Sequence, residues 1–141
     1  MDKRSIKHSH LDRIVQFFQY KHPQTKLIIL KGSENKDIDE YLTYQNAEAS
    51  TTMDIDGNMS VIISSIAGKA AIYEELGHVL QFINDGNITT DSRIRFEREI
   101  EVAQCLVNSR KNNLTQEEYE QTLRNLEYYE KSLEALSKWT F

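Results

Sequence analysis

Residues 71–82 constrain the fold of this chain more than any other stretch, because their apolar side chains recur at the helical period. At about 100° per residue the apolar side chains gather on one side of a helix, and they are Ile72, Leu76, Val79, Leu80 and Ile83. The other side carries Glu74, His78 and Gln81, with Glu75 close by. The pattern predicts an amphipathic helix over residues 69–84 that presents carboxylates and an imidazole opposite its apolar side.

The spacing of the polar residues in this helix is that of a metal site. Glu74 and His78 are four residues apart, so their side chains are neighbours on one helix face. Zinc-dependent hydrolases place two ligands at this spacing, and a glutamate directly after the first ligand acts as general base. Here Glu74 and His78 occupy the two ligand positions and Glu75 occupies the general-base position. The alternative is that all three residues belong to the solvated face of a surface helix.

A third ligand would have to come from elsewhere, because catalytic zinc sites use three protein ligands. The helix predicted over residues 93–110 contains two candidates, Glu99 and Glu101. Glu99 falls within the apolar arc of that helix, where an isolated carboxylate costs on the order of several kcal/mol unless it is paired or bound to a cation. Arg95, on the same flank, could be its partner. Three alternatives stand: Glu99 is the ligand, Glu101 is the ligand, or neither is and Glu99 reaches water at the helix edge.

The remaining patterns predict an α+β fold that is mainly helical. A helix over residues 10–20, capped by Ser9, leads into a buried strand over residues 26–30, and residues 37–44 form a short helix or an irregular link. Strands over residues 51–55 and 59–64 form a hairpin around the turn at 56–58. The helix of residues 69–84 follows, and then two C-terminal helices. Ser92 is the predicted cap of the first, and Thr115 with Glu118 forms a capping box for the second, which runs to residue 138.

The composition limits the classes of function. A chain of 141 residues fits one domain, with residues 1–8 expected to be flexible. The net charge of −5 argues against a broad nucleic-acid-binding face. No stretch approaches the roughly 20 apolar residues of a membrane span, and no signal peptide is visible. The single cysteine, Cys105, excludes an intrachain disulfide and is expected to be an inert, half-buried thiol.

Four pieces of the chain, in this order, resemble the zincin-like metallopeptidase superfamily. More narrowly, they resemble metallopeptidase-type toxin domains at the C-terminal ends of bacterial polymorphic toxins. The pieces are the Asp-rich turn and strand of residues 56–63, the Glu-Glu-x-x-His-x-x-Gln motif of residues 74–81, the Glu-Ile-Glu segment of residues 99–101 and the Leu-Thr-x-x-Glu segment of residues 114–118. Together they span roughly residues 50–135.

The resemblance implies a zincin-like fold and specific roles for residues. Glu75 would be the general base, Glu74 and His78 would be metal ligands, and Glu99 or Glu101 would be the third ligand of a divalent ion, zinc or manganese. It also implies a secreted or delivered effector domain that cleaves a protein or peptide in the cytoplasm of a target cell, with a cognate immunity protein as partner. One departure is that Glu74 replaces a histidine, and a hard carboxylate shifts preference from zinc toward Mn²⁺ or Mg²⁺.

Two other functions fit the same residues. Without a metal, His78 could act as acid or base with Glu74 or Glu75, for example in an RNase toxin. Alternatively, the chain could be a non-catalytic binding module on a zincin-like scaffold that has lost its metal.

Overall fold

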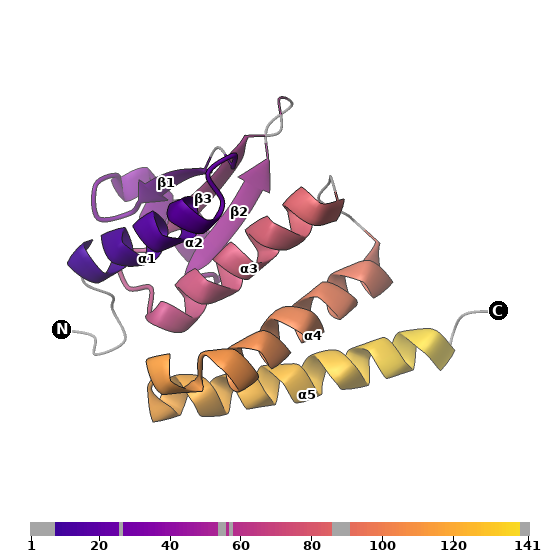
Figure 1. Ribbon diagram of the computed structural model, residues 1–141. Coiled ribbons are helices and arrows are strands. Elements are labelled where there is room, and N and C mark those ends of the chain that lie inside the picture. Colours follow the sequence, from indigo (N-terminus) through magenta and orange to yellow (C-terminus); the bar gives the residue numbers. More distant parts are fainter. Residues whose placement is uncertain (1–7, 26, 54–55, 57, 86–90, 139–141) are drawn as a thin grey trace. The chain divides into compact units, whose positions relative to one another are not determined.

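The structure is a computed structural model that describes residues 8–25, 27–53, 56, 58–85 and 91–138 (Figure 1). These residues form five α-helices, one short 3-10 turn and three strands. The predicted mainly helical α+β fold is confirmed. The chain divides into two compact units, residues 1–87 and residues 88–141. The single-domain organisation and the zincin-like assignment stay predictions, and residues 1–7 lie outside the described residues.

The first unit contains a small mixed sheet with the strand order β1-β3-β2. β1 (Leu27–Lys31) pairs in parallel with β3 (Met59–Ile63), and β2 (Ala49–Met53) pairs with β3 in the antiparallel direction. The β2–β3 pairing confirms the predicted hairpin, although residues 54, 55 and 57 of its connection lie outside the described residues. The parallel partner of β1 was not predicted from the sequence. β2 is therefore an outer strand, bonded to a neighbour along one edge only within the described sheet.

Two helices of this unit, α1 (His8–Lys21) and α3 (Lys69–Asp85), pack on the same face of the sheet (Figure 1). Successive side chains of a strand point to opposite faces, and β3 buries Met59, Val61 and Ile63 on the helix side. These side chains form one core with α1, α3 and Ala67; its helical members are Leu11, Phe18, Ile72, Leu76 and Val79. The apolar side of α3 predicted from the sequence is thus held against the sheet.

The connection between β1 and β2 contains a helix, α2 (Lys36–Tyr44). Of the two alternatives predicted for residues 37–44, a short helix or an irregular link, the helix is therefore correct. Asn35 caps it, with its side-chain oxygen accepting a hydrogen bond from the backbone N–H of Asp37 at 3.0 Å. The carboxylate of Asp39 accepts hydrogen bonds from the backbone N–H of Ser65 at 2.8 Å and from its hydroxyl at 2.6 Å. A side chain at Gly32 would overlap this carboxylate, so the glycine leaves room for Asp39 of α2 beside the end of β1.

A second carboxylate ties down the same connection. The backbone N–H of Gly68, directly before α3, donates to a carboxylate oxygen of Glu48 at 3.2 Å, and the N–H of Ser64 donates to the Glu48 carbonyl at 2.8 Å. A carboxylate beside the N-terminus of a helix also interacts favourably with the positive end of the helix dipole. The start of α3 is therefore fixed by residues that precede β3 in the chain.

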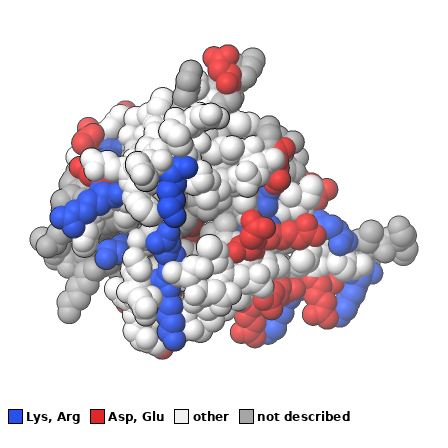
Figure 2. Space-filling view, viewed as in Figure 1, with Lys and Arg blue, Asp and Glu red and all other residues white. Residues whose placement is uncertain are grey.

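The second unit is a pair of helices, α4 (Ser92–Ser109) and α5 (Gln116–Lys138), joined through a 3-10 turn at Lys111–Asn113 (Figure 1). The predicted capping box of α5 is confirmed: the N–H of Glu118 donates to the Thr115 hydroxyl at 3.1 Å, and the N–H of Thr115 donates to the Glu118 carboxylate at 3.0 Å. Acidic and basic side chains adjoin along α5 (Figure 2), as in the 2.8 Å ion pair between Glu127 and Lys131. This hydrogen-bonded pair lowers the pKa of Glu127 and raises the pKa of Lys131.

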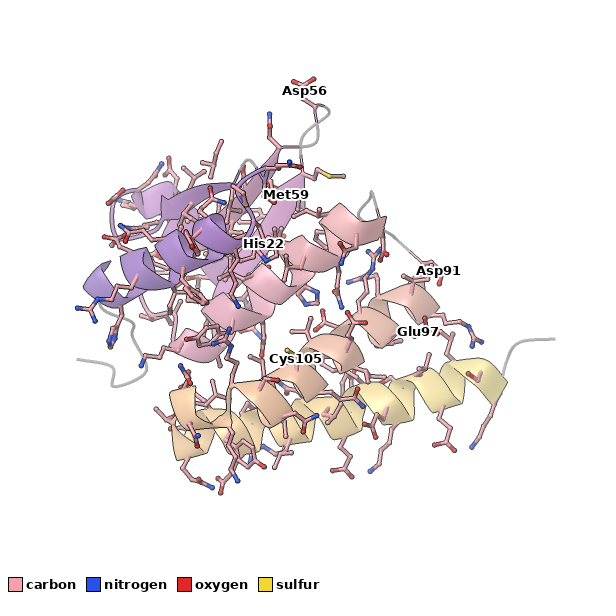
Figure 3. The ribbon with its side chains drawn as sticks, in the orientation of Figure 1. His22, Asp56, Met59, Asp91, Glu97 and Cys105 are labelled. Carbon is pink, nitrogen blue, oxygen red and sulfur yellow. The ribbon has the colours of Figure 1, made fainter. Side chains whose placement is uncertain are left out.

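Four details of the sequence prediction were wrong. Asp91, not Ser92, caps α4 (Figure 3), because its carboxylate accepts a hydrogen bond from the N–H of Ile94 at 3.1 Å. Ser9 lies inside α1, which already begins at His8. Ile83 is 42% exposed, since the last turn of α3 is exposed from this residue onward. Cys105, on α4 (Figure 3), is exposed rather than half-buried.

No helix among the described residues is long and apolar enough to cross a membrane. The sequence-based expectation that the chain has no membrane-spanning helix is met in that part of the chain.

Candidate functional site

The polar side of α3 is only partly solvated. His78 is 9% exposed and Gln81 is 6% exposed, while Glu74 and Glu75 are half-buried. His78 and Gln81 therefore do not lie on a solvated face of the helix. Buried polar side chains are stable only when they are hydrogen-bonded, so their partners indicate how this part of the helix is organised.

Glu75 is tied to the sheet. The hydroxyl of Thr51, on β2, donates a hydrogen bond to Oε2 of Glu75. Thr51 stands opposite Val61 in the register of β2 and β3, so the position of the Glu75 carboxylate follows from the pairing of the hairpin. Hydrogen bonds to a charged acceptor are stronger and better oriented than those between neutral groups. The residue predicted to be the general base is thus held in one direction by an outer strand.

His78 is held within α3 itself. Its Nδ1 and the side-chain oxygen Oε1 of Gln81 are 2.8 Å apart, one helical turn along. The ring of Phe82 stacks on the imidazole with a centroid distance of 6.2 Å and an interplanar angle of 19°. Both contacts come from residues three and four positions after His78, where helical side chains are neighbours.

The structure brings three of the predicted site residues, Glu74, Glu75 and His78, onto one stretch of α3. Glu99 is half-buried and Glu101 is exposed on α4, which belongs to the second unit. In either unit taken by itself, no three described His, Cys, Asp or Glu side chains lie close enough together to hold a metal ion. Ligation by Glu99 or Glu101 therefore stays a prediction.

The donor groups on α3 fit a divalent cation in their chemistry. An imidazole with one or two carboxylates is a ligand set for Zn²⁺ or Mn²⁺. Ligating histidines also commonly donate their second ring N–H to an oxygen acceptor. The contact between Nδ1 of His78 and Oε1 of Gln81 has this form.

The arginine of α4 that is buried is Arg98, at 8% exposure, and not Arg95, which is exposed. Arg98 lies four and eight residues before Val102 and Leu106, which are also buried. Its long apolar stem can join such a stripe, since arginine buries its methylenes along apolar surface. The sequence-based suggestion that Arg95 is a buried partner of Glu99 is therefore wrong, because Arg95 is exposed and Arg98 is the buried arginine.

A hollow of about 480 Å³ on the first unit is lined by Gly32 and by residues of α2, namely Lys36, Asp39, Glu40, Thr43 and Tyr44. No residue of α3 lines it. Both oxygens of Asp39 already accept hydrogen bonds from Ser65, and Lys36 lies 4.0 Å from Glu40. Asp39 thus joins α2 to the connection between β3 and α3, and the lining of this hollow is a weaker candidate site than the polar side of α3.

Sequence reasoning proposed Glu74, Glu75 and His78 as site residues but did not point to Thr51. The strand alternation predicted for residues 51–55 places Thr51 and Met53 on one face, which was a usable signal. That this face meets α3 depends on the sheet order, which no local pattern gives.

No family model, curated protein or solved structure matches the chain. The likeness to zincin-like toxin domains accordingly rests on the four sequence pieces alone.

Proposed function

We propose that the protein is a metal-dependent hydrolase of the metallopeptidase type that acts as a toxin or effector domain. The observation that carries the proposal is the arrangement on α3. The Glu75 carboxylate is oriented by Thr51, and the His78 imidazole is oriented by Gln81, on a helix whose other side is fixed in the core. Such orientation before a substrate arrives is what catalytic groups require.

In this proposal Glu74 and His78 hold the ion, and Glu99 and Glu101 stay the sequence-based candidates for a third ligand. A divalent cation bound there would supply Lewis-acid chemistry, by lowering the pKa of a water molecule and polarising a carbonyl group. Glu75 would act as the general base toward an attacking water, and the hydrogen bond from Thr51 keeps its carboxylate in position to accept the proton.

A peptide is the substrate class best supported by the sheet. β2 is an outer strand, and outer strands can pair with an extended peptide through their backbone groups. A peptide pairing along β2 would run near Thr51 and hence near the Glu75 carboxylate. The toxin role, delivery into a target cell and a cognate immunity protein rest only on the resemblance of the four sequence pieces.

Metal titration tests the proposal. Protein stripped with a chelator is titrated with Mn²⁺ and Zn²⁺ in a calorimeter, and then incubated with a peptide library. We expect one ion per chain. His78→Ala should weaken binding by more than about 100-fold, because loss of an outer-shell partner alone costs about 10–100-fold.

Four further variants sharpen this test. Glu75→Gln should keep the ion but lose peptide cleavage, and Glu97→Gln, at an exposed site on α4, is the matched control (Figure 3). Comparing Glu99→Gln with Glu101→Gln identifies the third ligand. If the chain takes up neither ion, the hydrolase proposal is wrong.

A metal-free function is the second candidate. The observation that favours it is that polar groups of α3 already have protein partners, since Glu75 accepts from Thr51 and His78 contacts Gln81. This candidate covers an RNase using His78 with Glu74 or Glu75, and a non-catalytic binding module. RNA cleavage in the presence of a chelator, abolished by His78→Ala, supports the RNase. Intact RNA together with no metal uptake supports the binding module.

A further inference from the structure

We infer that Gln81 is a positioning residue that holds His78 in its Nδ1–H tautomer and so makes Nε2 the nitrogen that binds a metal or accepts a proton. The role of Nε2 rests on the proposed function, but the tautomer does not. It follows from a contact inside α3 and from the chemistry of the two side chains.

The direction of the hydrogen bond between His78 and Gln81 determines the tautomer of the imidazole. The side-chain oxygen of Gln81 is an acceptor only, and it lies 2.8 Å from Nδ1 of His78. The ring nitrogen must therefore be the donor. A neutral imidazole carries a proton on only one of its two nitrogens, so a proton on Nδ1 leaves the lone pair on Nε2.

Burial of both side chains strengthens the effect of this hydrogen bond on the ratio of the two neutral forms of His78. His78 is 9% exposed and Gln81 is 6% exposed, so water competes weakly for either group. Free histidine side chains in water favour the other neutral form, with the proton on Nε2. A hydrogen bond of ordinary strength is enough to change the ratio of the two forms by roughly three- to tenfold.

Two neighbouring residues of α3 also orient the imidazole ring. The Gln81 oxygen sets the direction of Nδ1, and the Phe82 ring stacks on the imidazole plane at 19°. Both residues are fixed to His78 by the helix backbone, so these two contacts form within one turn of α3. Nε2 then points away from the Gln81 oxygen, because the two ring nitrogens lie on different sides of the ring.

The prediction can be tested on the full chain by long-range ¹H–¹⁵N spectra of protein labelled at its four histidines, at a pH where the rings are neutral. His78→Ala assigns the signal of His78. The wild-type protein should show the Nδ1–H form. In Gln81→Leu the ratio should move by roughly three- to tenfold toward the Nε2–H form.

Two variants separate positioning from a merely structural role. Gln81→Glu supplies another oxygen acceptor and should restore the Nδ1–H form. Gln121→Leu makes the same change at an exposed position on α5 and should leave the spectrum of His78 unchanged. A wild-type spectrum dominated by the Nε2–H form would overturn the inference even if Gln81→Leu failed to fold, and so would an unchanged ratio in folded Gln81→Leu.

The same variants distinguish this inference from the proposed function. If the chain binds a metal, Gln81→Leu should weaken binding by about 10–100-fold and Gln81→Glu should recover most of it. If the wild-type protein shows the Nδ1–H form but takes up no metal, the hydrolase proposal fails and the positioning role of Gln81 stands. If metal binds equally well to Gln81→Leu and the tautomer ratio does not change, the hydrolase proposal stands and the role of Gln81 is wrong.

Discussion

At the scale of single residues, Thr51 connects the candidate site to the sheet through its hydrogen bond to Glu75. Thr51→Val removes the hydroxyl and keeps the branched shape that suits a strand. We expect the free energy of unfolding to fall by about 1 kcal/mol, because the lost bond goes to a charged group but is only partly buried. Urea denaturation followed by circular dichroism measures this change.

The neighbouring Thr52 provides the control, because it lies on the same strand but is exposed on the other face. Thr52→Val should leave the free energy of unfolding nearly unchanged or raise it slightly, since valine favours strands. Equal losses in the two variants would show that the Thr51 hydroxyl contributes nothing specific.

The residues of the site differ in how far sequence could reveal them. Glu74, Glu75 and His78 could be proposed because the i, i+4 spacing of a helix is local and places neighbouring side chains on one face. Thr51 is 24 residues from Glu75 along the chain, and their contact depends on the position of β2 beside α3. Long-range contacts of this kind follow from topology, which periodicity does not encode.

At the scale of elements, each of the two helices of the second unit begins with a side-chain cap whose contribution to stability can be measured. Asp91→Ala and Thr115→Ala should each lower the free energy of unfolding by about 1 kcal/mol, because each removes a side chain that accepts a backbone N–H at the start of a helix. Ser92→Ala should change it little, since Ser92 is the first residue inside α4 rather than its cap. Chemical denaturation of the three variants measures these differences.

A loss on Ser92→Ala as large as that on Asp91→Ala would contradict this assignment of the α4 cap. The error in the sequence prediction has a simple origin, because Asp91 and Ser92 are adjacent and both residue types cap helices well. The capping box of Thr115 and Glu118 was predicted correctly because two residues three apart have to agree, which makes the pattern more specific.

At the scale of the whole molecule, the helices and the hairpin were predictable, but the sheet order and the two-unit organisation were not. Period-3.6 and period-2 patterns identify elements from neighbouring residues. The parallel pairing of β1 with β3 joins segments separated by α2 and β2, and several arrangements of a buried strand satisfy the same local pattern. Which units the elements form depends on these longer contacts.

The organisation of the core makes a prediction about folding. Among the described residues, the main hydrophobic cluster draws only on residues between Leu11 and Phe82, all within the first unit. A fragment of residues 1–87 therefore contains its own core, and we expect it to unfold cooperatively on heating and to keep the Nδ1–H form of His78. A fragment of residues 88–141 has two helices and few buried apolar side chains, notably Val102, Ala103 and Leu106, so it should be marginally stable.

Circular dichroism melts and the dispersion of amide signals measure both fragments. A non-cooperative transition in the first fragment would mean that its core is completed by residues after 87, and the cluster between α1, β3 and α3 would then not be sufficient to fold the unit that carries the candidate site.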